Sequence, residues 1–378
     1  MKWVTMWGNA QSTVVPQAAT YAKDITLRYP IYVPFSGNKI RIELDNYCVN
    51  EDVYINKVSV GISNKLHEKC TFYSYLTFNG NNDITIKAHK SVKSDELSIE
   101  LKENDYLVVS LYLSNYTNLS GGVDIIGPLS KGYFAYGNFV DSETLDMNKY
   151  KSTSWVHFLS NIDIYTSEDN YSIICYGDSI TSQDWPDYLQ LELKNSGINN
   201  VSVVRKAVSG TRILRQYECM LYQSYGLKGE NRFNHEISSV CGAKKIIIQH
   251  GINDIIHPVG ETINIYRPMS DMPTQVELQD GILYYLNELS KYNLEYYVGT
   301  LLPIYGWRTY NLDKENFKNE FNLWLQTLNC IDFGNEIGFY NGEAFQFKEN
   351  CDSGDHLHPS KYAYQLMAKL ALKKLYNL

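Results

Sequence analysis

The sequence predicts two domains of different fold class: an all-β sandwich of jelly-roll type over residues 1–165, and an α/β domain built on a parallel sheet over residues 166–378. Three observations support this. The chain has 378 residues, enough for about two domains of ordinary size. Short β-rich runs without a long helical pattern fill the first part. From about Tyr171 onward, apolar strands alternate with helical stretches.

The first part is typical of antiparallel strands because apolar and polar residues alternate along it. Ile40, Ile42 and Leu44 share one face while Arg41 and Glu43 share the other, a period of two that indicates a half-buried strand. Clusters of Gly, Asn and Asp separate the runs. The expected strands are 26–34, 39–44, 53–62, 83–87, 96–101 and 106–113. Residues from about 140 to 170 are polar and fit either domain.

In the second part, strands and helices follow one another, which predicts βαβ units and a parallel sheet covered on both faces. The expected strands are 173–176, 201–204, 245–249 and 294–301. The expected helices are 185–194, 233–240, 276–292, 315–328 and 362–375. Active sites of such sheets lie outside the carboxyl ends of the strands, so the residues that follow each strand are the first candidates.

Composition and charge exclude several classes of partner. Hydrophobic residues make up 44% of the chain and charged residues 20%, as in soluble globular proteins. A formal net charge of -8 argues against a nucleic-acid partner, because phosphate binding needs a basic surface. No segment has the roughly 20 apolar residues that a spanning helix needs, so we expect no membrane partner. A homo-oligomer stays open.

The N-terminus and the cysteines favour a cytoplasmic protein. The first residues lack the apolar core and the small-residue cleavage site of a signal peptide, although a mature secreted form would look the same. The seven cysteines are scattered and lack a CxxC spacing, which favours reduced thiols over a disulfide framework or a zinc site. The 32 tyrosines fit either compositional drift or a sugar-binding surface, where an aromatic ring with a polar tip suits wet contacts.

Three polar or small residues follow three successive strands of the α/β domain. Ser179, in Gly-Asp-Ser, can present its hydroxyl at a helix N-terminus, or it can be an ordinary helix cap. Gly210 can bring a backbone N–H close to a ligand, or it can be a turn glycine. Asn253 can direct its amide at an oxyanion, or it can form an Asx-turn.

A further polar cluster precedes the last helix. Asp355 and His358 are three residues apart, so one short turn can bring the carboxylate to one ring nitrogen and leave the other nitrogen free as a base. His356 is the competing base, but an extended turn would point it away from Asp355. Capping groups of the helix entry, or metal ligands from the His-x-His pair, are the alternatives. We expect no metal and no cofactor, because no further ligand cluster is evident.

Together these residues supply a nucleophile, a base, an orienting acid and oxyanion donors, which is the full set that acyl transfer requires. Two neighbouring residues are candidates for the substrate pocket. Trp185 can form a wall of an acyl pocket or belong to the core, and His250 can line the pocket or be a buried, hydrogen-bonded histidine.

At these residues the chain resembles the SGNH hydrolases, also called GDSL-type esterases. Their four blocks are matched by 177–179, 210, 251–254 and 355–359. The resemblance implies a flavodoxin-like αβα fold, with Ser179 as nucleophile, His358 as base and Asp355 orienting it. It also implies an oxyanion hole formed by the N–H groups of Ser179 and Gly210 and by the amide of Asn253.

The N-terminal part resembles a two-domain branch of the same family, which begins with a Trp-containing segment and a Thr-Leu-Arg strand, here 3–7 and 26–28. The chain departs from the family at Ser182-Gln183, where an Asp-Gly is usual, and it lacks the signal peptide of many members. The expected activity is hydrolysis of small carboxylic esters, with O-acetyl groups on carbohydrates as the leading substrates. The alternatives are a lipase, arylesterase or thioesterase on longer acyl chains, or a glycan-binding protein with a silent SGNH domain.

Overall fold

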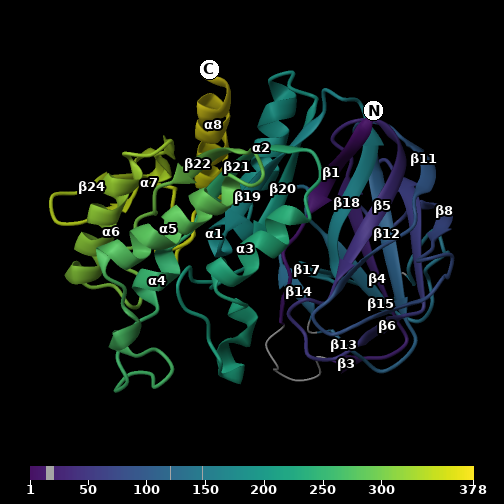
Figure 1. Ribbon diagram of the computed structural model, residues 1–378, viewed down its shortest axis with the longest axis horizontal. Helices are drawn as coiled ribbons and strands as arrows, with labels where there is room; N and C mark the ends of the chain where they lie inside the picture. Colours follow the sequence, from purple (N-terminus) through teal and green to yellow (C-terminus); the bar gives the residue numbers. More distant parts are fainter. Residues whose placement is uncertain (14–20, 120, 147) are drawn as a thin grey trace.

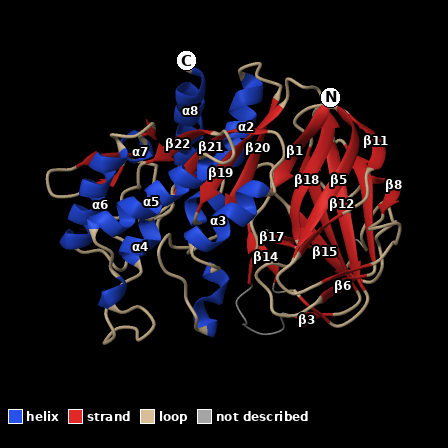
Figure 2. Cartoon of the chain, in the orientation of Figure 1, coloured by secondary structure: helices blue, strands red, loops and turns tan. Residues whose placement is uncertain are grey.

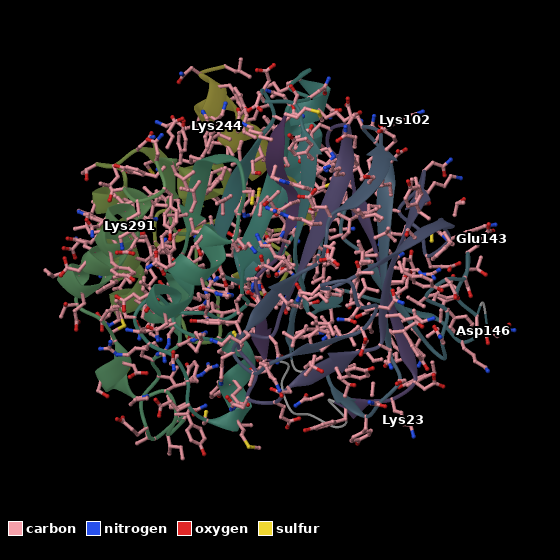
Figure 3. All side chains as sticks on the ribbon, turned by 45° about the vertical axis from the view of Figure 1, so that its right-hand side comes forward. Lys23, Lys102, Glu143, Asp146, Lys244 and Lys291 are labelled. Atoms are coloured by element: carbon pink, nitrogen blue, oxygen red, sulfur yellow. The ribbon has the colours of Figure 1, made fainter. Side chains whose placement is uncertain are left out.

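The computed structural model describes residues 1–13, 21–119, 121–146 and 148–378. It has a β-rich N-terminal half and an α/β C-terminal half that lie side by side in contact (Figures 1 and 2). Exposed charged side chains such as Lys23 and Lys102 point outward at the margin of the molecule (Figure 3). Among the described residues, no helix is both long and apolar enough to cross a membrane.

The N-terminal half is a β-sandwich of two antiparallel sheets with a hydrophobic core. One sheet contains β1 (Lys2–Gly8), β18 (Leu159–Thr166), β5 (Gly37–Asp45), β10 (Ser91–Lys93) and β11 (Leu97–Leu101). The other contains β16 (Lys151–Thr153), β15 (Gly132–Tyr136), β4 (Ile25–Tyr32), β12 (Tyr106–Leu113), β7 (Lys57–Ser63) and β8 (Thr71–Leu76). Short pairings complete it: β2 (Ser12–Thr13) and β17 (Trp155–His157) with β14 (Gly121–Asp124), β3 (Tyr21–Ala22) with β13 (Thr117–Asn118), and β6 (Val53–Ile55) with β9 (Ile84–Ile86).

The predicted alternation along β5 is present, but its polar face is not open to water. Ile40, Ile42 and Leu44 are buried in the sandwich core, as expected. Glu43, expected on the solvent side, is only 4% exposed because the α/β domain covers the outer face of this sheet. Burial raises the pKa of Glu43, although Lys206 of the α/β domain pulls it down.

The C-terminal half contains a five-stranded parallel sheet in the order β20 (Val201–Ala207), β19 (Tyr171–Gly177), β21 (Ala243–Gln249), β22 (Glu295–Gly299), β23 (Cys330–Ile331). Numbered along the chain, this is the 2-1-3-4-5 order of flavodoxin-like folds. The central stretches of β19 (173–176) and β21 (246–248) are apolar and buried, as expected for a sheet that is covered on both faces, whereas β20 also buries Arg205 and Lys206. The strand order reverses between β19, which is the first strand of this sheet along the chain, and its neighbour β21. Ligand sites of open α/β sheets lie at such a switch point.

The helices form two layers around this sheet. α2 (Trp185–Asn195) packs against α8 (Lys361–Tyr376), while α3 (Gly229–Ser238), α5 (Gln275–Leu289) and α6 (Leu312–Leu325) lie together on the other side (Figure 1). Shorter elements are α1 (Ser179–Ser182), α4 (Ile252–Ile256), α7 (Phe333–Ile337), the 3₁₀ helices η1 (Met220–Tyr225) and η2 (Met269–Asp271), and a hairpin of β24 (Gly338–Tyr340) and β25 (Phe345–Phe347).

Local capping explains where two helices begin. A capping box at Thr274 and Glu277 starts α5, and the Asn311 side chain accepts from Lys314 N to start α6 three residues before the expected position. The segment of uncertain assignment, 140–170, contributes β16, β17 and β18 to the sandwich sheets. β18 ends at Thr166 and β19 begins at Tyr171, while the domain boundary at 165/166 stays a prediction.

Candidate active site

The register of the parallel sheet places three candidate loops at one edge. Gly177, the last residue of β19, pairs with Ala207 of β20 on one side and with Gln249 of β21 on the other. Ser179, Gly210 and Asn253 follow these three paired positions within two to four residues. The carboxyl ends of three adjacent strands therefore present them together.

The turn around Ser179 is built by its two preceding residues. A Cβ at Gly177 would overlap Gln249 O, so only glycine lets β19 approach β21 this closely. Asp178 caps α1 by accepting from Ile180 N at 3.0 Å, and Ser179 is the first helical residue. The alternative that Ser179 caps the helix is therefore wrong, because Asp178 does so. Burial raises the pKa of Asp178 to about 7.

Ser179, His358 and Asp355 form a continuous hydrogen-bonded chain. His358 Nε2 lies 2.9 Å from Ser179 Oγ, and His358 Nδ1 lies 2.6 Å from Asp355 Oδ2. A carboxylate only accepts hydrogen bonds, so Nδ1 donates to Asp355, and Nε2 is left to accept from the serine hydroxyl. This tautomer is the one in which the imidazole can take a proton from Ser179.

The loop before α8 holds Asp355 in place. Its Oδ1 accepts from the backbone N–H groups of Leu357 and His358, at 3.0 and 2.8 Å. Partial burial pushes the pKa of Asp355 upward, but the hydrogen bonds from the His358 side chain and backbone outweigh it, and the net pKa is lowered. The carboxylate therefore stays ionised beside the imidazole at neutral pH.

His356, the competing base, points elsewhere. Its Nδ1 lies 2.6 Å from Asp352 Oδ2, its side chain is 53% exposed, and its backbone φ is 64°. Its ring lies close to Gly306. The geometry thus distinguishes the two histidines, which the sequence pattern alone did not.

Two backbone N–H groups at the site have no partner. Neither Ser179 N–H nor Gly210 N–H donates to any other residue in the described part of the chain. Gly210 has a φ of 80°, in the left-handed region that favours glycine. Asn253 is 3% exposed and donates one amide hydrogen to Thr211 O at 3.0 Å, which leaves its second amide hydrogen free.

Asp254 ties the Gly210 loop to the helix that carries Asn253. Its two carboxylate oxygens accept from Ile213 N at 2.8 Å and from Leu214 N at 3.1 Å. Burial raises the pKa of Asp254 to about 6, while these two N–H groups pull it down. These two hydrogen bonds connect the segment after Gly210 to α4.

The model of the GDSL-like lipase/acylhydrolase family matches residues 160–371, more than half of the chain. The chain belongs to this family. Among solved structures, it is similar to an acetylxylan esterase from Geobacillus stearothermophilus, with 13% identity and a TM-score of 0.41, covering 56% of this chain and 97% of that one. It is also similar to a GDSL-like lipase from Bacteroides thetaiotaomicron VPI-5482, with 14% identity and a TM-score of 0.40, covering 56% and 92%. No curated protein matches the chain.

Both tentative pocket residues lie in the core. Trp185 is fully buried, packs on Phe333 and donates its indole N–H to Thr181 Oγ1 at 3.3 Å. His250 is 1% exposed and hydrogen-bonded through both ring nitrogens, to Tyr285 OH at 3.1 Å and to Thr211 O at 3.2 Å. Neither side chain offers surface to a substrate pocket, which corrects the pocket assignment in favour of the core alternative for both.

Ser182 and Gln183, where the chain departs from the usual family residues, have defined contacts. Ser182 Oγ lies 3.0 Å from Ser209 Oγ, next to Gly210, and donates to Ser179 O at 3.1 Å. Gln183 Oε1 accepts from Tyr364 OH at 3.0 Å. The departure thus links the α1 turn to the Gly210 loop and to α8.

Sequence reasoning missed two aromatic residues beside the site. The Trp307 ring is perpendicular to the His358 imidazole, with centroids 6.5 Å apart. Trp307 lies in the loop after β22, the fourth strand of the α/β domain along the chain. The candidate residues were those that follow the first three strands, and the same rule applied to the fourth strand would have included this loop. Tyr225, at the end of η1, lies against Gly210, where its ring occupies the space of a Cβ. No sequence signal marks it.

A metal would need a cluster of ligands at this site. In the part of the chain that the structure describes, no group of three or more His, Cys, Asp or Glu side chains could hold a metal ion.

Proposed function

We propose that the chain is a serine esterase that hydrolyses carboxylic esters of small acyl groups through an acyl-enzyme. The observation that carries the proposal is the chain of contacts from Ser179 Oγ to His358 Nε2 at 2.9 Å, and from His358 Nδ1 to Asp355 at 2.6 Å. A nucleophile, a base within hydrogen-bond reach and an acid that orients the base are the parts of covalent acyl transfer.

In the first half-reaction, Ser179 Oγ attacks the ester carbonyl carbon while its proton moves to His358 Nε2. The tetrahedral intermediate collapses, the bond from carbon to the alcohol oxygen breaks, and His358 returns the proton to the leaving alcohol. In the second half-reaction, water donates a proton to His358 as it attacks the acyl-enzyme, and the carboxylic acid leaves with Ser179 reprotonated. Ionised Asp355 stabilises the imidazolium that forms in each half.

The oxyanion in this proposal lies among the N–H groups of Ser179 and Gly210 and the amide of Asn253. Two facts support the assignment: among the described residues, both backbone N–H groups lack a hydrogen-bond partner, and buried Asn253 has one amide hydrogen that no described residue accepts. Donors that are fixed before the reaction stabilise the developing charge without reorganisation. The link from Asp254 to the Gly210 loop supplies such fixing.

For the substrate, we propose O-acetyl groups on carbohydrates. Trp307 places an aromatic ring beside the His358 imidazole, with ring centroids 6.5 Å apart. Aromatic rings with a polar edge suit sugar faces that stay partly hydrated. The experiment is acetate release from a panel of acetylated oligosaccharides by wild type and by Ser179→Ala. Release by wild type alone supports the proposal, and equal release by the variant contradicts it.

A second candidate is an esterase for longer acyl chains, and one observation favours it. Large apolar side chains are exposed on η1 and on the loop before η2: Met220, Leu221, Ile263 and Ile265 are each at least 60% exposed. The two segments are joined by a hydrogen bond from Asn264 to Tyr222 OH at 2.7 Å. A series of p-nitrophenyl esters separates the candidates, because an acetyl pocket rejects butyrate and longer chains, whereas an apolar rim would favour them.

A third candidate, a glycan-binding protein with a silent catalytic domain, has a direct test. A fluorophosphonate probe labels an activated serine, so labelling that Ser179→Ala abolishes excludes it, and inertness of the wild type toward the probe would support it.

A further inference from the structure

The strand that leads to Gly210 is packed directly onto the N-terminal sandwich. The buried ammonium of Lys206, in β20, donates to Asn9 O at 2.8 Å and to Ser160 O at 3.2 Å, both in the sandwich domain. Two residues later, Val208 is 1% exposed and belongs to the hydrophobic core of the sandwich. The backbone that approaches Gly210 is therefore held by the other domain.

The sandwich also holds η1. From β2, Ser12 Oγ donates to Ser224 O at 2.8 Å and Thr13 Oγ1 donates to Gln223 O at 2.6 Å. Gly226, with a φ of 70°, follows η1 and approaches so closely that a Cβ there would lie 3.0 Å from Ser12 Oγ. β2 is itself paired with β14 in the sandwich, so these bonds tie the end of η1 to a sheet.

Tyr225, the last residue of η1, lies between the two elements that carry the proposed oxyanion donors. Its ring fills the space beside Gly210 that a side chain would occupy. On its other side it stacks on His257, with ring centroids 5.2 Å apart. His257 ends α4, the helix of Asn253, and its N–H donates to Asn253 O at 3.2 Å. The Tyr225 ring thus contacts both Gly210 and the end of α4, the helix that carries Asn253.

We propose that the sandwich is a positioning element of the active site: through Ser12 and Thr13 it fixes η1, and through η1 it holds Tyr225 against Gly210 so that the Gly210 N–H keeps its direction. The inference rests on the proposed function, because Gly210 matters only if it is an oxyanion donor. Tyr225, Ser12 and Thr13 are positioning residues, since they act through Gly210. The ring of Tyr225 carries the effect, because within the described part of the chain its hydroxyl has a single hydrogen bond, a 3.4 Å contact from Arg267 Nη2.

The test is steady-state kinetics on p-nitrophenyl acetate with three variants of the full-length chain, followed by a control and a combined variant. Tyr225→Ala should lower kcat by roughly tenfold to a hundredfold, the size expected for a small misplacement of a reacting group. Tyr225→Phe keeps the ring and should stay within roughly threefold of wild type. Ser12→Ala and Thr13→Val together should lower kcat by roughly threefold to tenfold, in line with the loss of two hydrogen bonds. KM should change little in each.

A matched control separates positioning from general loss of stability. Thr117 also donates its hydroxyl to a backbone carbonyl, that of Asn115 at 2.9 Å, but entirely within the sandwich. Thr117→Val should retain the kcat of wild type. An equal fall in kcat for Thr117→Val would overturn the proposal, as would a rise of KM alone for Tyr225→Ala, which would make Tyr225 a substrate contact. Thermal unfolding checks that each variant is folded at the assay temperature.

The combined variant tests whether the sandwich acts through Tyr225. In the Tyr225→Ala background, the Ser12 and Thr13 substitutions should lower kcat by less than about twofold further, because the contact that they support is already lost. A full multiplicative effect would overturn the route through Tyr225. Failure of the proposed function is distinct: it would appear as wild-type turnover by Ser179→Ala, whatever the Tyr225 variants do.

Discussion

Replacing Asp355 by asparagine should abolish most turnover while leaving the loop folded. The two oxygens of Asp355 have different partners: Oδ1 accepts from the N–H groups of Leu357 and His358, and Oδ2 accepts from His358 Nδ1. An asparagine can keep the first set only by placing its oxygen there, which turns its NH₂ group toward His358 Nδ1. Two donors cannot share that bond, so Nδ1 becomes the acceptor and the proton moves to Nε2.

The size of the effect follows from this change of tautomer. With a proton on Nε2, His358 cannot accept the proton of Ser179, whose Oγ lies 2.9 Å away. Loss of the orienting acid in a Ser-His-Asp triad lowers kcat by roughly 10³–10⁴, which is about 4 to 5 kcal/mol of transition-state stabilisation. Binding of substrate does not use this proton, so KM should change by less than about threefold.

The assay is hydrolysis of p-nitrophenyl acetate at neutral pH, with circular dichroism as the check on folding. The matched control is Asp352→Asn, because Asp352 contacts His356 through the same pair of atoms, Oδ2 and Nδ1, at 2.6 Å, while His356 has no contact with Ser179 among the described residues. The control should keep kcat within about threefold of wild type. If Asp355→Asn retained more than about a tenth of wild-type kcat while folded, the assignment of Asp355 as the orienting acid would be refuted.

Three further predictions follow from the same geometry. Asn253→Ala should lower kcat by roughly 10²–10³ at nearly constant KM, the usual loss for one oxyanion donor; a change in KM alone would mean that Asn253 only positions substrate. His358→Ala should remove turnover and His356→Ala should retain most of it, and the reverse order would exchange their roles. Burial raises the pKa of Asp178 to about 7, so the folded state favours the protonated carboxyl. The contribution of this group to the free energy of unfolding is complete below the unfolded pKa of about 4 and is lost as pH rises toward 7. Asp178→Asn cannot ionise, so chemical denaturation should show its stability relative to wild type rising by up to about 4 kcal/mol between pH 4 and pH 8, and a pH-independent difference would contradict the raised pKa.

Much of the fold could be predicted because local patterns and packing agree. The apolar strands of the second half and the amphipathic pattern of its helices are properties of short windows, and they predicted the alternation of strands and helices that builds the parallel sheet. The candidate site followed from one rule, that such sheets present their sites at the strand ends. Ser179, Gly210 and Asn253 lie there because Gly177, Ala207 and Gln249 are in register.

What failed depends on contacts between residues far apart in the chain. Glu43 was expected in water, because the period of β5 reports only that its two faces differ, not that a second domain covers the polar one. Trp185 and His250 lie next to site residues in sequence, but their side chains point into the core. Tyr225 reaches Gly210 through η1, a short 3₁₀ helix without a periodic pattern.

The N-cap of α1 shows that the first residue of a helix is harder to predict from sequence than the helix itself. The Gly-Asp-Ser sequence contains two residues that can cap a helix, and Asp178 and Ser179 differ by one position in the register of the turn. The backbone decides between them: Asp178 accepts from Ile180 N, which leaves Ser179 Oγ free for His358. A one-residue shift in helix start cannot be resolved from composition, since helix ends vary by that amount.

The most direct test of the central claim is to map the site of a fluorophosphonate adduct by peptide mass spectrometry of the full-length chain. The account predicts one adduct per chain, on Ser179. Labelling should be slowed strongly by His358→Ala, because the serine hydroxyl needs that base to accept its proton. An adduct on another residue, or an active enzyme that the probe leaves unlabelled at Ser179, would contradict it.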